Sequence, residues 1–278
     1  MNIRDLLKQA TRQLNTHSDS ARLDAEVLLC YVLQKNRAYL LTWPEQELTD
    51  SQLGQFQQLC DARVTGQPVA HLTEEREFWS LPLKVTADTL IPRPDTELLV
   101  EQILQVCPEQ AELKLLDLGT GSGAIAIALA TEHPGWKIIA TDFSEPALKV
   151  AQQNAQRLKL SNIEFRQGNW FEPLSGLSFD IIVSNPPYIP SNDPHLTQGD
   201  VRFEPLSALV SGAEGLDDIE TICQQASDYL NPGGLLIVEH GYDQAEKIRP
   251  IFQKNGFTNI NQGRDIAHNP RITYGYKI

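Results

Sequence analysis

The 278-residue sequence has little cysteine and no long hydrophobic run. Its 4 cysteines are far apart, with no Cys-x-x-Cys pair and no cysteine–histidine cluster, which argues against a disulfide framework and against a zinc site. No stretch of about 18 uncharged apolar residues occurs, as a membrane span would require. Charges also interrupt the first residues, where a signal peptide would be apolar. We therefore expect a cytoplasmic protein with reduced, buried cysteines, no membrane association and no bound metal.

Positive charge is also scarce, because 23 Lys and Arg stand against 36 Asp and Glu, for a net charge of −13. Proteins that hold nucleic-acid phosphates present net positive faces, so this balance argues against direct nucleic-acid binding. It argues equally against a polybasic membrane-surface protein. What is present is an ordinary globular composition, 41% hydrophobic and 21% charged, over a length that suits two domains.

Residues 1–75 have the pattern of a small helical domain. Apolar residues at positions 3, 6, 7, 10 and 14 recur at steps of three and four, which places them on one helix face. Two further helical segments follow, the second of them beginning at Thr49, a suitable helix cap. With 7 basic and 10 acidic residues, this domain lacks the positive charge of a domain that holds nucleic acid. We expect it to recognise a protein partner or to brace the second domain.

The remaining chain divides into a connector and an α/β domain. Residues 76–94 combine a short strand pair with the stiff segment Ile91-Pro92-Arg93-Pro94, in which the prolines fix the backbone. Residues 95–278 alternate apolar strands with helices, which predicts right-handed crossovers and a mostly parallel sheet with helices on both faces. The strands are expected at residues 114–118, 137–141, 163–167, 180–184, 235–239 and 271–276.

A glycine-rich turn follows the first strand of this domain, in the sequence Asp117-Leu118-Gly119-Thr120-Gly121-Ser122-Gly123. Ligands of such sheets lie at the carboxyl ends of the strands, and glycines let the backbone approach them closely. Asp142 ends the next strand, where a carboxylate can accept hydrogen bonds from both hydroxyls of a ribose. Asp117 favours S-adenosylmethionine, because a carboxylate suits the methionine amino group and repels a pyrophosphate. A nicotinamide or flavin site and a purely structural turn remain open.

A second turn follows the fourth strand, in the sequence Asn185-Pro186-Pro187-Tyr188. The two prolines hold the turn rigid and carry no N–H groups that could occupy its carbonyls. The amide oxygen of Asn185 and the carbonyl of Pro186 can then accept both N–H bonds of one external NH2 group, with the Tyr188 ring beside it. The turn therefore predicts a site for a planar amino or amide nitrogen.

These two turns together resemble those of the methyltransferases that modify planar nitrogens. Within that class the sequence is similar to the PrmC (HemK) family, the protein glutamine N5-methyltransferases of class-1 peptide chain release factors. The resemblance spans nearly the whole chain, including the helical domain. Further matching motifs are Arg76-Glu77-Phe78-Trp79, Ile91-Pro92-Arg93-Pro94-Asp95-Thr96-Glu97, Arg202-Phe203-Glu204-Pro205 and Ala208-Leu209-Val210.

The resemblance implies a Rossmann-like class I S-adenosylmethionine-dependent methyltransferase fold. It implies methylation of N5 of the glutamine in a release factor's Gly-Gly-Gln motif, which modulates translation termination. The residues that carry over as catalytic are Asn185, Pro186 and Tyr188, and Pro187 joins them in binding the substrate. The family commonly has Asp where this chain has Asn169. The implied cofactor-binding residues are Asp117, Gly119, Thr120, Gly121, Ser122, Gly123, Asp142, Asn169, Trp170 and Asn185.

The expected chemistry is attack of a glutamine amide nitrogen on the sulfonium methyl group, with S-adenosylhomocysteine as the product. That nitrogen is a poor nucleophile, since its lone pair is delocalised, and acceptors at Asn185 and Pro186 would hold it in line with the methyl group. No histidine stands in a sequence motif that indicates a general base. We expect a monomer that acts on the release factor, with residues 189–216 as a substrate-facing loop.

Two alternatives remain open from the sequence. The Asn-Pro-Pro-Tyr turn serves adenine as well as glutamine, so the first is an N6-adenine or other nucleic-acid methyltransferase, although the net charge of −13 disfavours it. The second is a non-catalytic module that only binds the cofactor. Arg93 also has two interpretations, one as a residue near the active site and one as an ordinary partner of a carboxylate.

Overall fold

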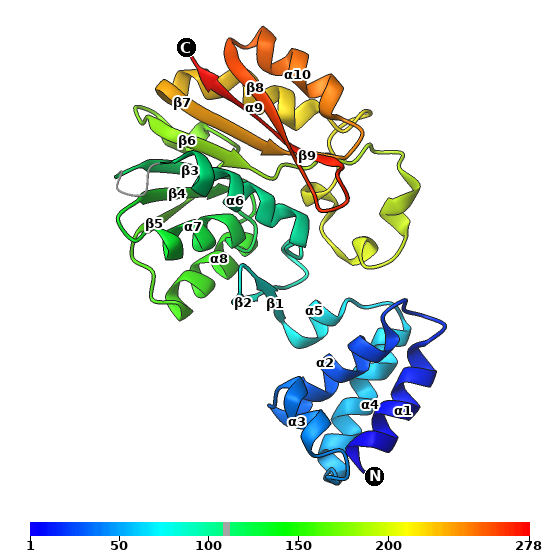
Figure 1. Ribbon diagram of the computed structural model, residues 1–278. Coiled ribbons are helices and arrows are strands. Elements are labelled where there is room, and N and C mark those ends of the chain that lie inside the picture. The colour runs from blue at the N-terminus through cyan, green and yellow to red at the C-terminus, as the bar shows by residue number, and fades with distance from the viewer. Residues whose placement is uncertain (108–111) are drawn as a thin grey trace. The chain divides into compact units, whose positions relative to one another are not determined.

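The computed structural model describes residues 1–107 and 112–278, and the chain forms two compact units (Figure 1). The first comprises residues 1–75 together with 195–203, and the second comprises residues 76–194 and 204–278. A short segment from the middle of the predicted 95–278 domain thus belongs to the helical unit. Residues 108–111, which that predicted domain includes, lie outside the described residues. No helix in the described ranges has the length and apolar character needed to cross a membrane.

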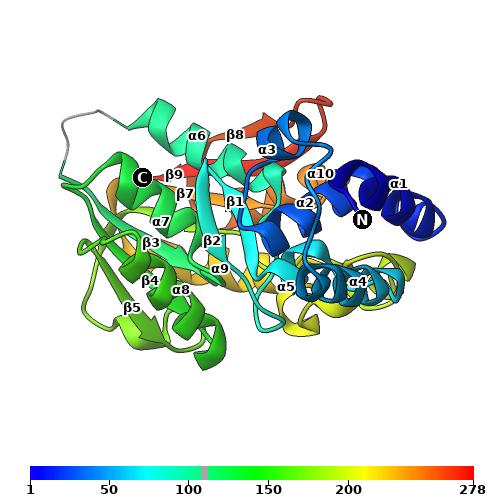
Figure 2. The ribbon, with the colours of Figure 1, turned by 90° about the horizontal axis from the view of Figure 1, so that it is seen from below.

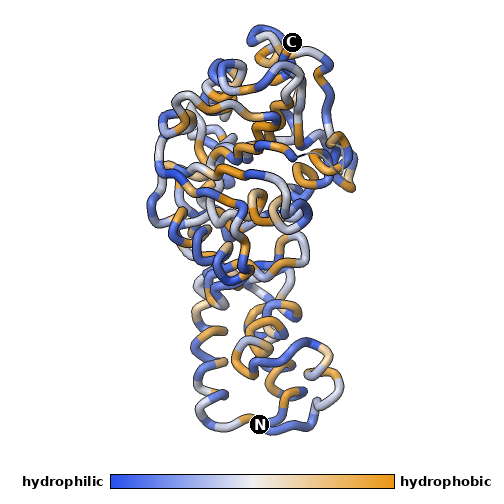
Figure 3. Tube along the Cα trace, turned by 90° about the vertical axis from the view of Figure 1, so that its left-hand side faces the viewer, coloured by the Kyte–Doolittle hydropathy of each residue, from blue (hydrophilic) through white to orange (hydrophobic). Residues whose placement is uncertain are grey.

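The first unit is helical, as predicted, and its helices alternate hydrophobic and hydrophilic segments along their length (Figure 3). All the predicted apolar residues of the first helix are buried. Thr49 caps the fourth helix as predicted: its side chain accepts a hydrogen bond from the backbone N–H of Gln52, whose side chain returns to the N–H of Thr49. The helices are α1 (Ile3–Leu14), α2 (Ala21–Leu33), α3 (Arg37–Thr42), α4 (Asp50–Val64) and α5 (Val69–Thr73).

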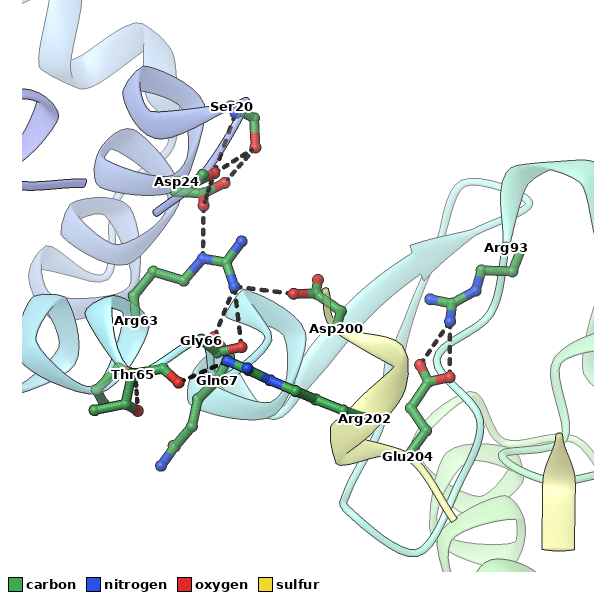
Figure 4. A network of polar contacts seen from close by, with 12 residues as sticks. Ser20, Asp24, Arg63, Thr65, Gly66, Gln67, Arg93, Asp200, Arg202 and Glu204 are labelled. Carbon is green, nitrogen blue, oxygen red and sulfur yellow. Dashed lines mark hydrogen bonds and ion pairs between the residues drawn. The ribbon is translucent and has the colours of Figure 1, made fainter. Parts of the chain in front are cut away.

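Residues 195–203 join the helical unit through two arginines (Figure 4). Arg63 of α4 is only 8% exposed and lies between two carboxylates, since its Nε donates to Asp24 at 2.7 Å and its Nη1 to Asp200 at 2.9 Å. Arg202 donates to the carbonyl of Thr65 at 2.8 Å. A buried guanidinium requires such partners, so Arg63 fixes the place of residues 195–203 on the helical unit.

The connector forms the predicted strand pair, β1 (Glu75–Phe78) and β2 (Leu81–Lys84). The two residues between the strands, Trp79 and Ser80, both have positive φ, 53° and 58°, as a two-residue type I′ hairpin turn requires. The short 3-10 helix η1 (Pro94–Thr96) then leads into α6 (Glu97–Val106).

The second unit is built on a seven-stranded sheet with the order β5-β4-β3-β6-β7-β9-β8. Neighbouring strands from β5 to β7 run parallel, whereas β9 runs antiparallel to β7 and to β8. The predicted, mostly parallel sheet is confirmed, but β8 was missed because this edge strand is largely polar. The strands are β3 (Lys114–Leu118), β4 (Lys137–Asp142), β5 (Ile163–Gln167), β6 (Phe179–Ser184), β7 (Leu230–Glu239), β8 (Phe257–Arg264) and β9 (Pro270–Lys277).

Helices cover both faces of this sheet, as predicted (Figure 2). Successive strand residues alternate between two hydrophobic clusters, so Leu115 and Ile181 pack on one face and Leu116 and Ile182 on the other. The first face carries α6, α7 (Ala124–Glu132) and α8 (Glu145–Arg157), and the second carries α9 (Asp217–Tyr229) and α10 (Ala245–Lys254).

The carboxyl ends of the central strands meet at one edge of the sheet. Leu118 of β3 pairs with Thr141 of β4 on one side and with Ser184 of β6 on the other. The chain order reverses between β3 and β6, and open α/β sheets bind their ligands at such a point. The glycine-rich turn, Asp142 and the Asn-Pro-Pro-Tyr turn are therefore brought together there.

Candidate active site

The glycine-rich turn joins β3 to α7 and is supported by Asp117. This residue is fully buried, and its Oδ2 accepts a hydrogen bond from the Thr120 hydroxyl at 2.6 Å. Burial raises the pKa of Asp117 to about 7, because its charged form loses its hydration. The backbone N–H of Thr120 donates to the carbonyl of Thr141 at 2.9 Å, which ties the turn to β4. Asp117 thus stabilises the conformation of the turn from the protein interior.

The glycines of this turn serve different purposes, although all have positive φ values, from 56° to 87°. A Cβ on Gly123 would lie 2.8 Å from Ile127 Cδ1 and 3.1 Å from Ala151 Cβ, so this glycine lets α7 pack closely against α8. A Cβ on Gly121 would meet no atom within 4 Å, because it faces open space. Gly121 can therefore face a ligand, whereas Gly123 is a packing residue.

Asp142 ends β4 beside the glycine-rich turn, as predicted. Its Oδ2 accepts from the backbone N–H of Gly121 and its Oδ1 from that of Ser144, both at 2.8 Å. These bonds fix the orientation of the carboxylate, and burial raises its pKa. Each carboxylate oxygen can accept a further hydrogen bond, so Asp142 can hold both hydroxyls of a ribose.

A cavity of about 340 Å³ lies at this edge of the second unit. The connector contributes residues 87–90 and Pro92 to its wall, and η1 contributes Thr96. The segment after the Asn-Pro-Pro-Tyr turn contributes residues 205, 207 and 208. The site residues predicted from the sequence divide into two groups. Those that line the cavity are Gly119, Thr120, Gly121, Ser122, Asp142, Asn169, Trp170, Asn185 and Pro187. Those outside its described lining are Asp117, Gly123, Pro186 and Tyr188.

The residues after β4 and β5 supply the aromatic part of this wall. Trp170 has a φ of 46°, and its ring lies so close to Gly119 that a Cβ there would be 3.4 Å from Trp170 Cζ3. Asn169, beside it, is exposed. Phe143 was not singled out from the sequence, yet it lines the cavity and is 72% exposed. Its position directly after Asp142, at the carboxyl end of a strand, was the available signal.

The Asn-Pro-Pro-Tyr turn leaves β6 with both polar side chains held from outside the turn. Asn185 Nδ2 donates to Thr96 Oγ1 at 3.1 Å, and the Tyr188 hydroxyl donates to Glu239 Oε1 at 3.2 Å. Burial and the nearby Glu239 carboxylate raise the pKa of Tyr188, so its phenol stays protonated at neutral pH. Because the amide nitrogen of Asn185 is engaged, its amide oxygen is the group left to accept a bond from a ligand.

Arg93 forms an ion pair, the second of its two interpretations. Its Nη2 donates to both oxygens of Glu204, at 2.9 and 2.7 Å (Figure 4). The Glu204 side chain is fully buried and also accepts from the backbone N–H of Ile91 at 3.3 Å. This pair joins the connector to the Glu-Pro motif, and Arg93 itself is not among the described residues that line the cavity.

Residues 189–216 are held against the turn by backbone hydrogen bonds. The N–H of Ile189 donates to the carbonyl of Leu209 at 2.8 Å, and the N–H of Ser211 donates to the carbonyl of Ile189 at 3.0 Å. Gln244 Nε2 donates to the carbonyl of Tyr188 at 2.9 Å. The position of the turn therefore depends on this segment as well as on β6.

Comparison with known proteins identifies both units. The model of the PrmC N-terminal domain matches residues 5–73, and a methyltransferase domain model matches residues 109–269. The release factor glutamine methyltransferase of Escherichia coli K12 is 51% identical over 269 residues, which cover 97% of this chain and 96% of that protein. The protein of the same name from Aliivibrio fischeri is 50% identical over 277 residues, covering 99% and 97%.

Solved structures of lower identity share the fold. A methyltransferase from Pyrococcus furiosus has a TM-score of 0.54 at 18% identity and covers 78% of this chain and 97% of its own. The 16S rRNA N2 G1207 methyltransferase of T. thermophilus has a TM-score of 0.51 at 18% identity, covering 73% and 50%. The predicted class I methyltransferase fold with an N-terminal helical domain is confirmed. The match to the PrmC N-terminal domain model and the identity of about 50% over nearly the full length of the bacterial relatives show that the chain belongs to the release factor glutamine methyltransferase family.

Proposed function

We propose that this chain transfers a methyl group from S-adenosylmethionine to the side-chain amide nitrogen of a glutamine in a class-1 peptide chain release factor. One observation carries the proposal: Asn185 lines the cavity with its Nδ2 bonded to Thr96, which leaves the amide oxygen as an acceptor for an amide N–H. The same cavity is lined by the glycine-rich turn and Asp142. An acceptor for a substrate nitrogen thus shares a cavity with residues suited to the cofactor.

The residues present fit this cofactor. Asp142 has both carboxylate oxygens oriented by backbone N–H groups and can accept from the two ribose hydroxyls. Gly121 leaves space that a Cβ would fill, so a ligand can lie against the backbone. Asp117 lies outside the described lining of the cavity and supports this site from behind the turn, through the bond that it accepts from the Thr120 hydroxyl. Trp170 and Phe143 offer aromatic surface for the adenine.

S-adenosylmethionine supplies an electrophilic methyl group on a sulfonium centre. The Asn185 amide oxygen and the Pro186 carbonyl accept the two N–H bonds of the glutamine amide, which orients its nitrogen in line for attack. The same dipoles stabilise the positive charge that develops on that nitrogen in the transition state. The Tyr188 ring, held by Glu239, borders this position. The methylated amide is acidic enough to lose its proton without a strong base.

His240, the residue after Glu239, has a structural role. His240 is fully buried, with Nδ1 bonded to the carbonyl of Gly241 at 2.8 Å and Nε2 to the Thr273 hydroxyl at 2.9 Å. Burial lowers its pKa, so it is neutral at physiological pH. Both ring nitrogens are occupied, which supports a mechanism without a histidine base.

The proposed partner is a protein, recognised in part by the helical unit. The acidic balance of the chain, a net charge of −13, disfavours a nucleic-acid substrate. Because release factors act on ribosomes, the proposed location is the cytoplasm. The enzyme is proposed to act on its partner as a monomer.

The test is transfer of a labelled methyl group. The protein is incubated with labelled S-adenosylmethionine and a class-1 release factor, and the modified peptide is located by mass. The expected product carries one methyl group on a glutamine side chain, and Asn185→Ala is expected to abolish it, with cofactor binding measured alongside turnover. A label found only on DNA or RNA, or near-normal methylation by Asn185→Ala, would overturn the proposal.

A further inference from the structure

A buried hydrogen-bonded chain runs from Glu239 through Thr96 to Asn185. Thr96 Oγ1 accepts from Asn185 Nδ2 at 3.1 Å, and the Thr96 side chain is the hydrogen-bonding neighbour that lowers the pKa of the Glu239 carboxylate against the effect of burial. Thr96 is 4% exposed and Glu239 2%, so bulk water does not compete for these bonds. Glu239 Oε1 also accepts from the Tyr188 hydroxyl at 3.2 Å. One carboxylate is thus linked to both polar side chains of the Asn-Pro-Pro-Tyr turn.

The direction of these bonds follows from the donor and acceptor capacity of each group. A carboxylate only accepts, so the single Thr96 hydroxyl proton points toward Glu239. The Thr96 oxygen can then only accept from Asn185, which must present Nδ2 to it and Oδ1 to the opposite side. Without the carboxylate, the Thr96 proton is free to turn toward Asn185. The amide can then reverse and present its NH2 group to the substrate amide, where two donors would face each other.

We propose that Glu239 and Thr96 are positioning residues that fix the amide orientation of Asn185, an inference that rests on the proposed function. They act through Asn185, whose amide oxygen meets the substrate. Glu239 also holds Tyr188, so one buried group sets two members of the turn.

The surroundings of Glu239 favour this role over a purely structural one. It forms no ion pair within 4 Å in the described chain, and its Oε2 is buried without a hydrogen-bond partner. The charged and titratable groups facing it are Tyr188, Asp95 and Arg271, and Arg271 is already paired with Asp95 at 3.2 Å. A buried carboxylate with so little compensation costs stability, which an uncharged side chain would not.

Replacement of Thr96 tests the chain at its middle member. Thr96→Val removes the hydroxyl with little change of shape and is expected to lower kcat about tenfold to hundredfold, the effect of one lost orienting hydrogen bond. Cofactor affinity and the KM for the release factor are expected to stay near wild type. Thr96→Ser keeps the hydroxyl and is expected to recover most of the rate. Thr273→Val is the matched control, because it also removes a buried hydroxyl, but from β9, where the hydroxyl bonds His240 and takes no part in the Glu239–Thr96–Asn185 contacts.

Replacement of Glu239 tests the same idea through pH. Burial raises the pKa of Glu239 to about 7, and the orienting form is the carboxylate. The kcat of the wild type is therefore expected to fall as pH drops through about 7, as Glu239 gains a proton. Glu239→Gln can donate to Thr96 and is expected to have a low kcat with this pH step absent. Thermal unfolding of each variant monitors its folding.

The outcomes separate this inference from the proposed function. If the wild type methylates a release-factor glutamine but Thr96→Val matches it in kcat, the positioning role is wrong and the proposed function stands. An unchanged pH step in Glu239→Gln would likewise overturn the inference. A wild type that leaves the release factor unmodified would overturn the proposed function and, with it, the inference.

Discussion

Individual residues around the glycine-rich turn divide between those that face the cavity and those that support its wall. Gly121 and Asp142 face it, whereas Asp117 and Gly123 lie behind them. The two sets alternate within a few positions of one another, because a tight turn directs successive groups to opposite sides. Substitutions at neighbouring positions should therefore affect different properties.

Asp142→Ala is expected to weaken cofactor binding at least about tenfold, since the hydrogen bonds of a carboxylate to two hydroxyls contribute about 1.5–3 kcal/mol each. Equilibrium dialysis with labelled cofactor measures the change. Glu164→Ala is the control, because Glu164 is an exposed acid on the neighbouring strand β5. Unchanged cofactor affinity in Asp142→Ala would remove the role assigned to this residue.

Gly121→Ala and Gly123→Ala form a matched pair, because both glycines have positive φ, 56° and 87°. Gly123→Ala is expected to lower the free energy of unfolding by about 3 kcal/mol, since the new Cβ meets Ile127 and Ala151 in addition to the strained backbone. Gly121→Ala is expected to lower the free energy of unfolding by about 1 kcal/mol but to weaken cofactor binding strongly. Denaturant unfolding and cofactor binding, measured on both variants, give the comparison. The reverse assignment of the two effects would contradict it.

Sequence reasoning at this scale identified the two turns but not the residues that hold them. The motifs are local, so their residues could be recognised from spacing alone. Thr96 and Glu239 are far apart in the sequence, and neither belongs to a pattern with Asn185. Their contact arises only because η1 and the carboxyl end of β7 lie beside the same turn, a tertiary arrangement that no local pattern encodes.

At the scale of elements, the alternation of apolar strands and helices was sufficient to predict most of the sheet. The central strands are apolar on both faces, as burial on both sides of a parallel sheet requires. Strand β8 was missed because an edge strand pairs on one side only and tolerates polar residues such as Asn259, Asn261 and Gln262. The attachment of residues 195–203 to the helical unit could not be predicted from the sequence either, since it depends on long-range contacts of two arginines, Arg63 and Arg202.

Arg63→Ala is expected to destabilise the helical unit by about 3 kcal/mol, because Asp24 would remain buried without its cation. Asp200→Ala removes the more exposed partner, whose side chain is 39% accessible, and is expected to cost about 1 kcal/mol or less. In both variants, amide hydrogen exchange in residues 195–203 is expected to accelerate. Equal protection of that segment in wild type and Arg63→Ala would contradict the assigned tie.

At the scale of the whole molecule, buried acids link stability to pH. Burial raises the pKa values of Asp117 and Glu239 to about 7, well above those of the unfolded chain. The folded state therefore binds more protons than the unfolded state between about pH 4 and pH 7, and stability is lost as pH rises through this range. Asp117→Asn is expected to flatten this decline in denaturant titrations at successive pH values. A decline of undiminished slope in that variant would assign the effect to other groups.

The chain passes between its two units three times, after residues 75, 194 and 203. A single break between residues 75 and 76 would consequently yield two fragments that still share a structural unit. The longer fragment retains Asp200 and Arg202, and the shorter one retains Arg63 and Thr65, their partners. The two fragments of this chain carry complementary sides of these contacts, so we expect them to reassemble when expressed separately, without an added dimerisation tag.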